Sequence, residues 1–317
     1  MAGACKTDPM PRKRIYRASI AVLALFAAAF GGPWADADTI TVGSKIDTEG
    51  ALLGTMIMLV LEHAGLHVAS KIGLGPTNIV RAAILAGEID IYPEYTGNGA
   101  EFFKREDDPA WKNARAGYEL VKALDQAQNG LIWLAPAPAN NTWAIAVRAD
   151  LARQCGTTLE GFSRCVDEGH QVRLAGSAEF VESPGGLPAF EKLYGFNLTQ
   201  SQMLVLAGGN TAATMRAASE GISGVNAGMA YATDGAVAAL HLVVLADDRG
   251  AEIVYEPAPV VRAVVLAAHP EIAQRLDPVF ATLTLERLQH LNAQIAVDGI
   301  DAQKVAADYL ATLGSAQ

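Results

Sequence analysis

Charged side chains and aromatic rings are scarce in this 317-residue chain, at 18% and 7% of the residues, and half of the residues are hydrophobic. This balance excludes an intrinsically disordered chain, and the length allows one large domain or two smaller ones. Basic residues are outnumbered, 24 against 34 acidic ones, which gives a net charge of −10. No basic cluster offsets this excess, so the sequence argues against a nucleic acid or an anionic membrane surface as partner.

Long apolar runs are also missing, with one short exception near the N-terminus. Residues 18–30 (ASIAVLALFAAAF) form an apolar stretch that is short for a membrane span of about 20 residues. Four basic residues precede it at 12–17, and an ADA sequence follows at 35–37. This order predicts a cleaved signal peptide over residues 1–37, with a membrane anchor as the alternative and Met10 as another possible start. Cleavage would remove five basic and two acidic residues and would change the net charge to −13.

Cysteine is rare. Cys5 lies in the expected signal peptide, which leaves Cys155 and Cys165, ten positions apart in a polar segment. An even pair of cysteines in an exported protein predicts a disulfide between them, with two free thiols as the alternative. The sequence has no CxxC redox motif.

Motifs of catalysis and of metal binding are absent from the sequence. There is no GxSxG elbow and no P-loop, and GLG at 73–75 lacks the third glycine of a dinucleotide-binding fingerprint. His63 and His67 are four residues apart, but Gly65 lies between them and no HExxH glutamate accompanies them. We therefore expect a protein without enzymatic activity, metal or cofactor.

The sequence does contain an alternation of strand-like and helix-like segments. In its first part these are 39–45 (strand), 47–66 (helix, capped by Asp47 or Thr48), 67–74 (strand), 77–88 (helix) and 89–95 (strand). Short connections between such segments predict a parallel sheet covered by helices, an α/β fold in which ligands bind beyond the carboxyl ends of the strands. The aromatic and glycine-rich stretch YPEYTGNG, which follows the third strand, falls at that position.

The alternation returns in the middle of the chain. Strands are expected at 143–149, 171–180, 202–208 and as a pair within 254–272, and helices at 185–195, 211–221, 273–297 and 302–313. Proline and asparagine interrupt the pattern at 135–142, and a second crossing is expected near 241–250. We therefore expect two lobes, one formed by 38–141 plus 245–317 and the other by 142–244.

Six segments of the chain, in their order, resemble the extracytoplasmic substrate-binding proteins of ABC importers for quaternary amines such as glycine betaine, carnitine and choline. They are ITVGSKIDTEG, GLGPTNIVRAAILAGEIDIYPEYTGNG, NNTWAIAV, SAEFVESPGGLPAFEKLYGF, AYATDGAV and YEPAPVVR. The likeness spans roughly residues 39–310 and is greatest to the OsmF/YehZ-like branch of the Gram-negative periplasm. It implies a two-lobed type II binding-protein clamshell, with a sheet flanked by helices in each lobe and the ligand between the lobes.

The resemblance also implies which residues hold the ligand. A quaternary ammonium group has no N–H to donate, so it is bound by the negative faces of aromatic rings, at roughly 0.5–2 kcal/mol per contact. The implied cage residues are Tyr95, Trp143 (where the family usually has tyrosine), Tyr231, Tyr255, Phe180 and the carbonyl of Asn141. For Phe180, packing in the core explains the residue as well as a place in the cage does.

The carboxylate end of a betaine is implied to lie near Lys45 and Asn98, the latter at a position where the family often has threonine. Ser183 occupies the place of an arginine that binds this carboxylate in the family. The loss of a guanidinium removes charge-assisted hydrogen bonds of roughly 1.5–3 kcal/mol each. The resemblance therefore implies weak betaine binding, or a less anionic ligand such as choline, unless another donor replaces the arginine.

Together these features predict a periplasmic solute-binding protein that captures a quaternary ammonium osmolyte and delivers it to an ABC permease. We expect a monomer that works with a permease and an ATPase encoded as separate chains. The alternatives are a periplasmic ligand sensor and a binder of another cationic or amino-acid solute. The sequence does not identify which amine is bound.

Overall fold

The computed structural model describes residues 39–183, 185–206 and 211–314, together with Met1 and Gly3. The chain divides into two units, Met1–Ala37 and Asp38–Gln317. The expected signal peptide over 1–37 lies outside the described residues, apart from Met1 and Gly3. Within the described part, no helix is long and apolar enough to cross a membrane. The second unit contains two mixed five-stranded sheets flanked by helices, which confirms the predicted fold class.

The first sheet has the strand order β2-β1-β3-β10-β4. Its strands are β1 (Thr39–Lys45), β2 (His67–Gly75), β3 (Ile91–Tyr95), β4 (Leu131–Trp133) and β10 (Pro257–Arg262). β1 pairs in parallel with β2 and β3, as the alternating pattern predicts, whereas β10 runs antiparallel to both β3 and β4. The carboxyl ends of β1 and β3 therefore lie at one edge of this sheet, with Lys45 and Tyr95 as their last residues.

The predicted pair of strands within 254–272 is wrong in its second half. After β10 the chain forms a helix, α11 (Ala263–Ala268). The prediction failed because the short apolar run AVVLAA fits a strand and a helix equally well by periodicity alone. The strand ends at Arg262, whose Nη1 lies 2.9 Å from Oδ1 of Asp90.

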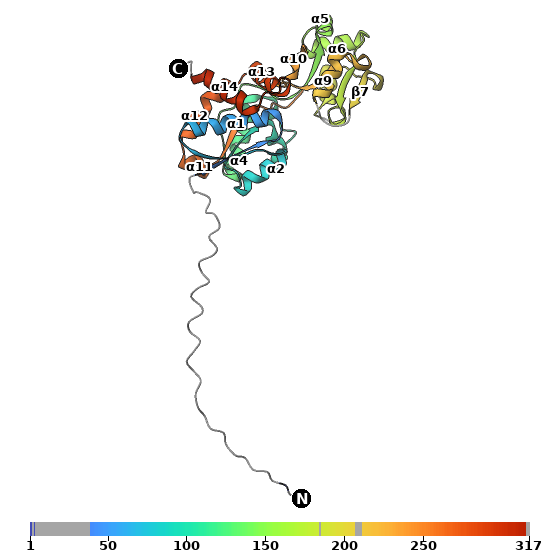
Figure 1. Cartoon of the computed structure of the whole chain (residues 1–317). Coiled ribbons are helices and arrows are strands. Elements are labelled where there is room, and N and C mark those ends of the chain that lie inside the picture. The colour runs from blue at the N-terminus through green and yellow to red at the C-terminus, as the bar shows by residue number, and fades with distance from the viewer. Residues whose placement is uncertain (2, 4–38, 184, 207–210, 315–317) are drawn as a thin grey trace. The chain divides into compact units, whose positions relative to one another are not determined.

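Helices from both ends of the chain surround the first sheet (Figure 1). They are α1 (Thr48–His63), α2 (Thr77–Ala86), α3 (Gly99–Phe102), α4 (Ala114–Asn129), α11, α12 (Glu271–Phe280), α13 (Leu285–Ala296) and α14 (Ala302–Gly314). Asp47 caps α1, where its Oδ1 accepts a hydrogen bond from the Gly50 amide at 2.7 Å. Leu52 of α1, Leu276 of α12, Leu288 of α13 and Val305 of α14 belong to one buried core. The C-terminal helices are therefore part of the same body as the N-terminal strands.

A buried ion pair lies within the helices of this sheet. The guanidinium of Arg81 on α2 donates two hydrogen bonds, of 2.8 and 2.6 Å, to the carboxylate of Asp125 on α4. Trp133 of β4 donates a third to Asp125 at 2.7 Å, and Phe102 lies with its ring centroid 4.3 Å from the guanidinium carbon. Tyr92 of β3 is fully buried and belongs to the core on this side of the sheet.

The second sheet has the strand order β7-β6-β8-β5-β9. Its elements are β5 (Trp143–Arg148), α5 (Ala149–Cys155), α6 (Leu159–Asp167), β6 (Leu174–Ser177), α7 (Ala178–Glu182), α8 (Leu187–Tyr194), β7 (Met203–Leu206), α9 (Thr211–Glu220), β8 (Ala227–Tyr231), α10 (Ala236–Ala239) and β9 (Leu242–Val244). The chain enters this sheet between β4 and β5 and leaves it between β9 and β10.

The predicted strand over 171–180 is too long. The strand β6 ends at Ser177, whose hydroxyl accepts a hydrogen bond from the Phe180 amide at 3.0 Å and caps α7. A short polar cap thus ends the strand and places Phe180 on a helix.

Cys155 at the end of α5 and Cys165 in α6 form a disulfide with a Cα–Cα distance of 5.6 Å. Both cysteines are buried in the core of the second sheet. The disulfide therefore fixes two helices that cover this sheet and lies outside the lining of the cavity described below.

Replacing both Cys155 and Cys165 with alanine should lower the free energy of unfolding by about 2–3 kcal/mol, because the disulfide restricts the unfolded chain over a loop of about ten residues. Chemical denaturation of the variant and of the oxidised wild type measures this difference. The reduced wild type serves as the control and should unfold at the same denaturant concentration as the variant. Equal unfolding midpoints for the oxidised wild type and the variant would contradict the prediction.

Candidate ligand-binding site

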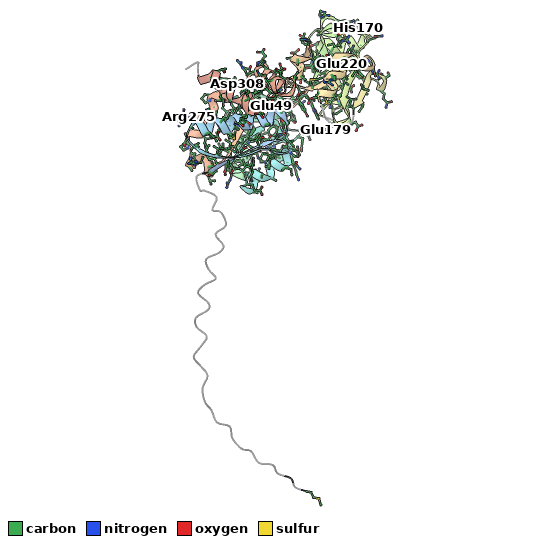
Figure 2. The ribbon with its side chains drawn as sticks, viewed as in Figure 1. Glu49, His170, Glu179, Glu220, Arg275 and Asp308 are labelled. Atoms are coloured by element: carbon green, nitrogen blue, oxygen red, sulfur yellow. A yellow bond between two sulfur atoms is a disulfide. The ribbon has the colours of Figure 1, made fainter. Side chains whose placement is uncertain are left out.

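A cavity of about 700 Å³ is lined by residues of both sheets. Lys45 and Tyr95 come from the carboxyl ends of strands in the first sheet, and Trp143 and Tyr231 come from neighbouring strands of the second. Its size falls within the range of ordinary small-molecule sites, roughly 300–1,000 Å³. Figure 2 labels Glu49 and Glu179, two acidic residues of its lining.

Among the described residues, four aromatic side chains line this cavity, and all four are among the five rings nominated from the resemblance: Tyr95, Trp143, Tyr231 and Tyr255. Tyr95 ends β3. Trp143 begins β5 and lies directly opposite Tyr231, the last residue of β8, in the antiparallel register. Tyr255 precedes β10. Rings from four separate segments of the chain are thus brought to one cavity by the ends of strands.

The glycine of the TGNG turn makes room for one of these rings. A Cβ atom added to Gly97 would lie 2.6 Å from Cδ1 of Tyr255 and 2.7 Å from Cγ2 of Ile253. The neighbouring Thr96 amide donates to the carbonyl of Glu256 at 3.0 Å, which holds the turn against the segment that carries Tyr255. Glycine at position 97 therefore serves the close approach of a ring.

Replacing Gly97 with alanine should weaken ligand binding about tenfold, because the new Cβ displaces the Tyr255 ring at an overpacking cost of about 1–3 kcal/mol. Calorimetric titration of the variant with the best wild-type ligand measures the change. Gly314→Ala is the matched control, since a Cβ at that position meets no atom of the described residues within 4 Å. Wild-type affinity in Gly97→Ala would show that the position of Tyr255 does not matter for binding.

Two residues nominated from the resemblance are not among the described lining residues of the cavity. Phe180 is fully buried and packs edge-on against Trp143, with 5.8 Å between the ring centroids and 78° between the planes. It therefore supports a wall of the cavity from behind. Ser183 follows α7, where its hydroxyl oxygen lies 3.4 Å from the Gly185 amide.

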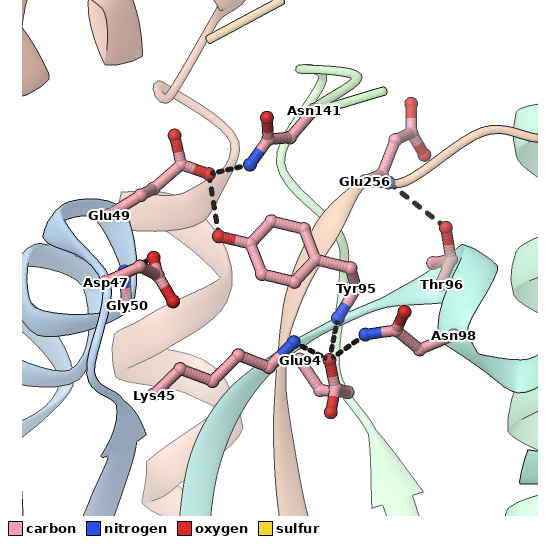
Figure 3. A network of polar contacts seen from close by, with 10 residues as sticks. All are labelled: Lys45, Asp47, Glu49, Gly50, Glu94, Tyr95, Thr96, Asn98, Asn141 and Glu256. Carbon is pink, nitrogen blue, oxygen red and sulfur yellow. Dashed lines mark hydrogen bonds and ion pairs between the residues drawn. The ribbon is translucent and has the colours of Figure 1, made fainter. Parts of the chain in front are cut away.

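Lys45 and Asn98, the expected partners of a ligand carboxylate, are both bound to Glu94 (Figure 3). One oxygen of Glu94, Oε1, accepts hydrogen bonds from Lys45 Nζ at 2.5 Å, from Asn98 Nδ2 at 2.7 Å and from the Tyr95 amide at 2.8 Å. The Lys45 ammonium also lies 4.5 Å from the centroid of the Tyr95 ring. The positive charge of Lys45 is thus compensated within the protein. Glu94 was not nominated from the sequence, although it stands beside Tyr95 in the same motif.

Glu49 on α1 is a buried carboxylate of the cavity lining, and it was not nominated from the sequence. Its Oε1 accepts hydrogen bonds from the Tyr95 hydroxyl at 2.8 Å and from Asn141 Nδ2 at 3.2 Å, and its Oε2 accepts one from Asn292 Nδ2 at 2.7 Å (Figure 3 shows the first two). Burial raises the pKa of Glu49 to about 7, although hydrogen bonds from Thr233, Tyr95 and Asn292 act in the opposite direction. In the sequence, an acid in the first turn of a helix is explained by the helix dipole alone.

The lining of the cavity is rich in acidic groups. Asp47, Glu49, Glu179 and Asp234 contribute carboxyl groups, and Lys45 is the one basic residue among the described lining residues. Burial raises the pKa of Asp234, whose Oδ2 accepts a hydrogen bond from the Tyr231 amide at 2.8 Å. Where the structure describes the chain, no three His, Cys, Asp or Glu side chains are grouped to hold a metal ion. Rings and carboxylates together favour an organic cation.

Two α/β sheets that jointly line one cavity of small-molecule size define the class of two-lobed solute-binding proteins. The model of one family, the substrate-binding domain of ABC-type glycine betaine transport systems (OpuAC), matches residues 38–312. The chain belongs to this family. It is a substrate-binding protein of a transport system and not an enzyme.

Relatives support this assignment over nearly the whole length. The glycine betaine-binding protein YehZ of Escherichia coli is 57% identical over 96% of this chain and 99% of its own. A glycine-betaine-binding protein of Pseudomonas aeruginosa is 34% identical over 92% of both chains. The solved structure of ligand-free YehZ from E. coli covers 88% of this chain and 99% of its own, with 60% identity and a TM-score of 0.81.

Proposed function

We propose that this protein captures a quaternary ammonium osmolyte, glycine betaine or a similar compound, in a cage formed by Tyr95, Trp143, Tyr231 and Tyr255. The observation that carries the proposal is that these four rings, from four distant segments, line one cavity that is rich in carboxylates. Such a cage matches a trimethylammonium group, which offers positive charge and no hydrogen-bond donor. The names of two relatives, both glycine betaine-binding proteins, point to the same ligand class.

We further propose that betaine is bound weakly. Ser183 replaces the arginine expected for its carboxylate, and Glu94 already occupies both Lys45 and Asn98. A ligand carboxylate must therefore share these donors with a buried glutamate. The cost falls on the anionic end of the ligand, and the trimethylammonium end is unaffected.

The two-sheet architecture supports a transport cycle by closure of two lobes. In this proposal residues 38–141 with 245–317 form one lobe and residues 142–244 form the other, in keeping with the passage of the chain between sheets before β5 and after β9. The lobes close around the ligand, and the closed form is presented to the permease. The protein acts as a monomer in the periplasm after removal of residues 1–37, and the permease and its ATPase are separate chains.

Calorimetric titration of residues 38–317 with glycine betaine, choline, carnitine and proline tests the proposal. We expect saturable binding of the trimethylammonium compounds, with a dissociation constant for betaine in the micromolar to millimolar range. The matched control ligand is 3,3-dimethylbutan-1-ol, which has the shape of choline with carbon in place of the charged nitrogen and should bind at least tenfold more weakly. Absence of heat with every trimethylammonium compound up to millimolar concentrations would refute the proposed function.

A further inference from the structure

Helix α13, which packs in the core of the first sheet, holds the segment 231–235 of the second sheet, which begins with Tyr231. Gln289 Nε2 donates to the carbonyl of Ala232 at 2.6 Å, and Asn292 Nδ2 donates to the carbonyl of Thr233 at 3.0 Å. A Cβ atom added to Gly235 would lie 2.1 Å from the backbone nitrogen of Ala293. The segment is thus in direct contact with the α13 backbone.

Glu49 connects this contact to the opposite wall of the cavity. The same amide group of Asn292 that binds Thr233 also donates to Oε2 of Glu49, and Oε1 of Glu49 accepts from the hydroxyl of Tyr95. Glu49 is 5% exposed, so these bonds are made in a largely dry environment. One carboxylate therefore joins a ring of the first sheet to the segment that carries a ring of the second.

The hydrogen-bond pattern fits an ionised carboxylate. Donor groups of Tyr95, Asn141 and Asn292 point at Glu49, and the buried amide oxygens of Asn141 and Asn292 have no hydrogen-bond partner among the described residues. An ionised carboxylate only accepts, whereas a protonated one must donate through one oxygen. Protonation would therefore place the new O–H group of Glu49 against one of these donor groups, unless an amide flipped or the Tyr95 hydroxyl rotated.

We propose that Glu49 is a positioning residue for the aromatic cage, and that its ionised form is the one that binds the cationic ligand. This inference rests on the proposed function. The ionised form keeps Tyr95, Asn141 and Asn292 in the orientations described. Its negative charge is separated from the Tyr95 hydroxyl by one hydrogen bond. A carboxylate that accepts a hydrogen bond from a phenol also makes that ring more electron-rich and a better partner for a cation.

The charged surroundings of Glu49 determine how binding depends on pH. Asp47 caps the helix that carries Glu49, Lys45 and Tyr95 come from the first sheet, and Asp234 lines the cavity from the second. With a pKa raised to about 7, Glu49 is half protonated near neutrality in the free protein. A bound cation stabilises the carboxylate and lowers this pKa, so binding releases a proton, and affinity rises as pH increases through neutrality.

Titration calorimetry of residues 38–317 with choline and with glycine betaine at pH 5.5, 7.0 and 8.5 tests this proposal. The ligands do not titrate in this range. We expect roughly tenfold tighter binding at pH 8.5 than at pH 5.5, which corresponds to a ligand-induced shift of about one pKa unit. At pH 7.0, titrations in buffers of different ionisation enthalpy should detect the released proton.

Glu49→Gln is the decisive variant, because it keeps an accepting oxygen and removes the charge. Its affinity should equal the weak, low-pH affinity of the wild type at all three pH values, without proton release. Tyr95→Phe keeps the ring and removes one bond to Glu49, and it should reduce the pH dependence even if Glu49→Gln does not fold. Glu252→Gln is the control: burial raises the pKa of Glu252 to about 8, but this residue lies outside the described cavity lining. It should keep the wild-type profile.

Several results would overturn the inference. These are a wild-type affinity independent of pH, an unchanged pH profile in both Glu49→Gln and Tyr95→Phe, or a profile lost in Asp234→Asn and kept in Glu49→Gln. The last result would assign the proton to Asp234. Failure of every trimethylammonium compound to bind at any pH would refute the proposed function and this inference together. Binding that does not vary with pH would refute the inference alone.

Discussion

Replacing Trp143 with alanine should weaken the binding of a quaternary ammonium ligand about 100-fold or more. Tryptophan is the strongest cation–π partner, and truncation removes both that contact and the apolar surface of a large ring, for a combined loss of about 3 kcal/mol. The position of Trp143 at the start of β5, opposite Tyr231, makes it a wall of the cavity. Calorimetric titration of the folded variant measures the loss.

The matched control for this prediction is Trp143→Tyr, which keeps an aromatic face at the same position and should bind within about tenfold of the wild type. The alanine variant also loses the edge contact with Phe180, which should lower its free energy of unfolding by about 1–2 kcal/mol. This free energy must therefore be measured separately from the affinity. Affinity within a few fold of the wild type in a folded Trp143→Ala protein would exclude the cage as described.

Replacing Asp125 with alanine should lower the free energy of unfolding by about 3–5 kcal/mol, the largest stability effect that we predict. Arg81 is 7% exposed, and without Asp125 its guanidinium would stay buried without a compensating charge. The indole N–H of Trp133 would lose its acceptor as well. Urea denaturation followed by circular dichroism measures the change.

An exposed ion pair provides the control for Asp125. Lys304 and Asp308 lie one turn apart on α14, with 2.9 Å between Nζ and Oδ2, and both side chains are about two-thirds exposed. Asp308→Ala should therefore change the free energy of unfolding by less than about 0.5 kcal/mol. Similar effects of the two substitutions would show that the Arg81–Asp125 pair is not buried as the structure has it.

The extent to which the sequence predicts this fold depends on the length and regularity of each element. The alternation over 39–95 predicts three strands and two helices correctly, because each apolar pattern is long enough to show its period. β4 has three residues and shows no period, and it is placed by pairing with β10. α7 and α11 were predicted as parts of strands, because helices of five or six residues offer too few positions to separate the two periods.

The residues of the candidate site are likewise predictable only where a local motif carries them. Tyr95, Trp143, Tyr231 and Tyr255 lie in local motifs, and a motif places a residue relative to its own strand end. The bond between Glu49 and Asn292 joins residues 243 positions apart, and it exists because α1 and α13 pack in one core. No local pattern reports such a contact. Phe180 shows the opposite limit, since its motif is local but its ring faces the core.

The placement of the four rings also has an evolutionary consequence. Tyr95, Trp143 and Tyr231 each stand at the end of a strand, and Tyr255 stands just before one. A substitution at any of them leaves the pairing of the strand interiors intact. The ligand range of such a protein can therefore drift by single substitutions, one wall at a time, while the scaffold stays under the same selection for folding.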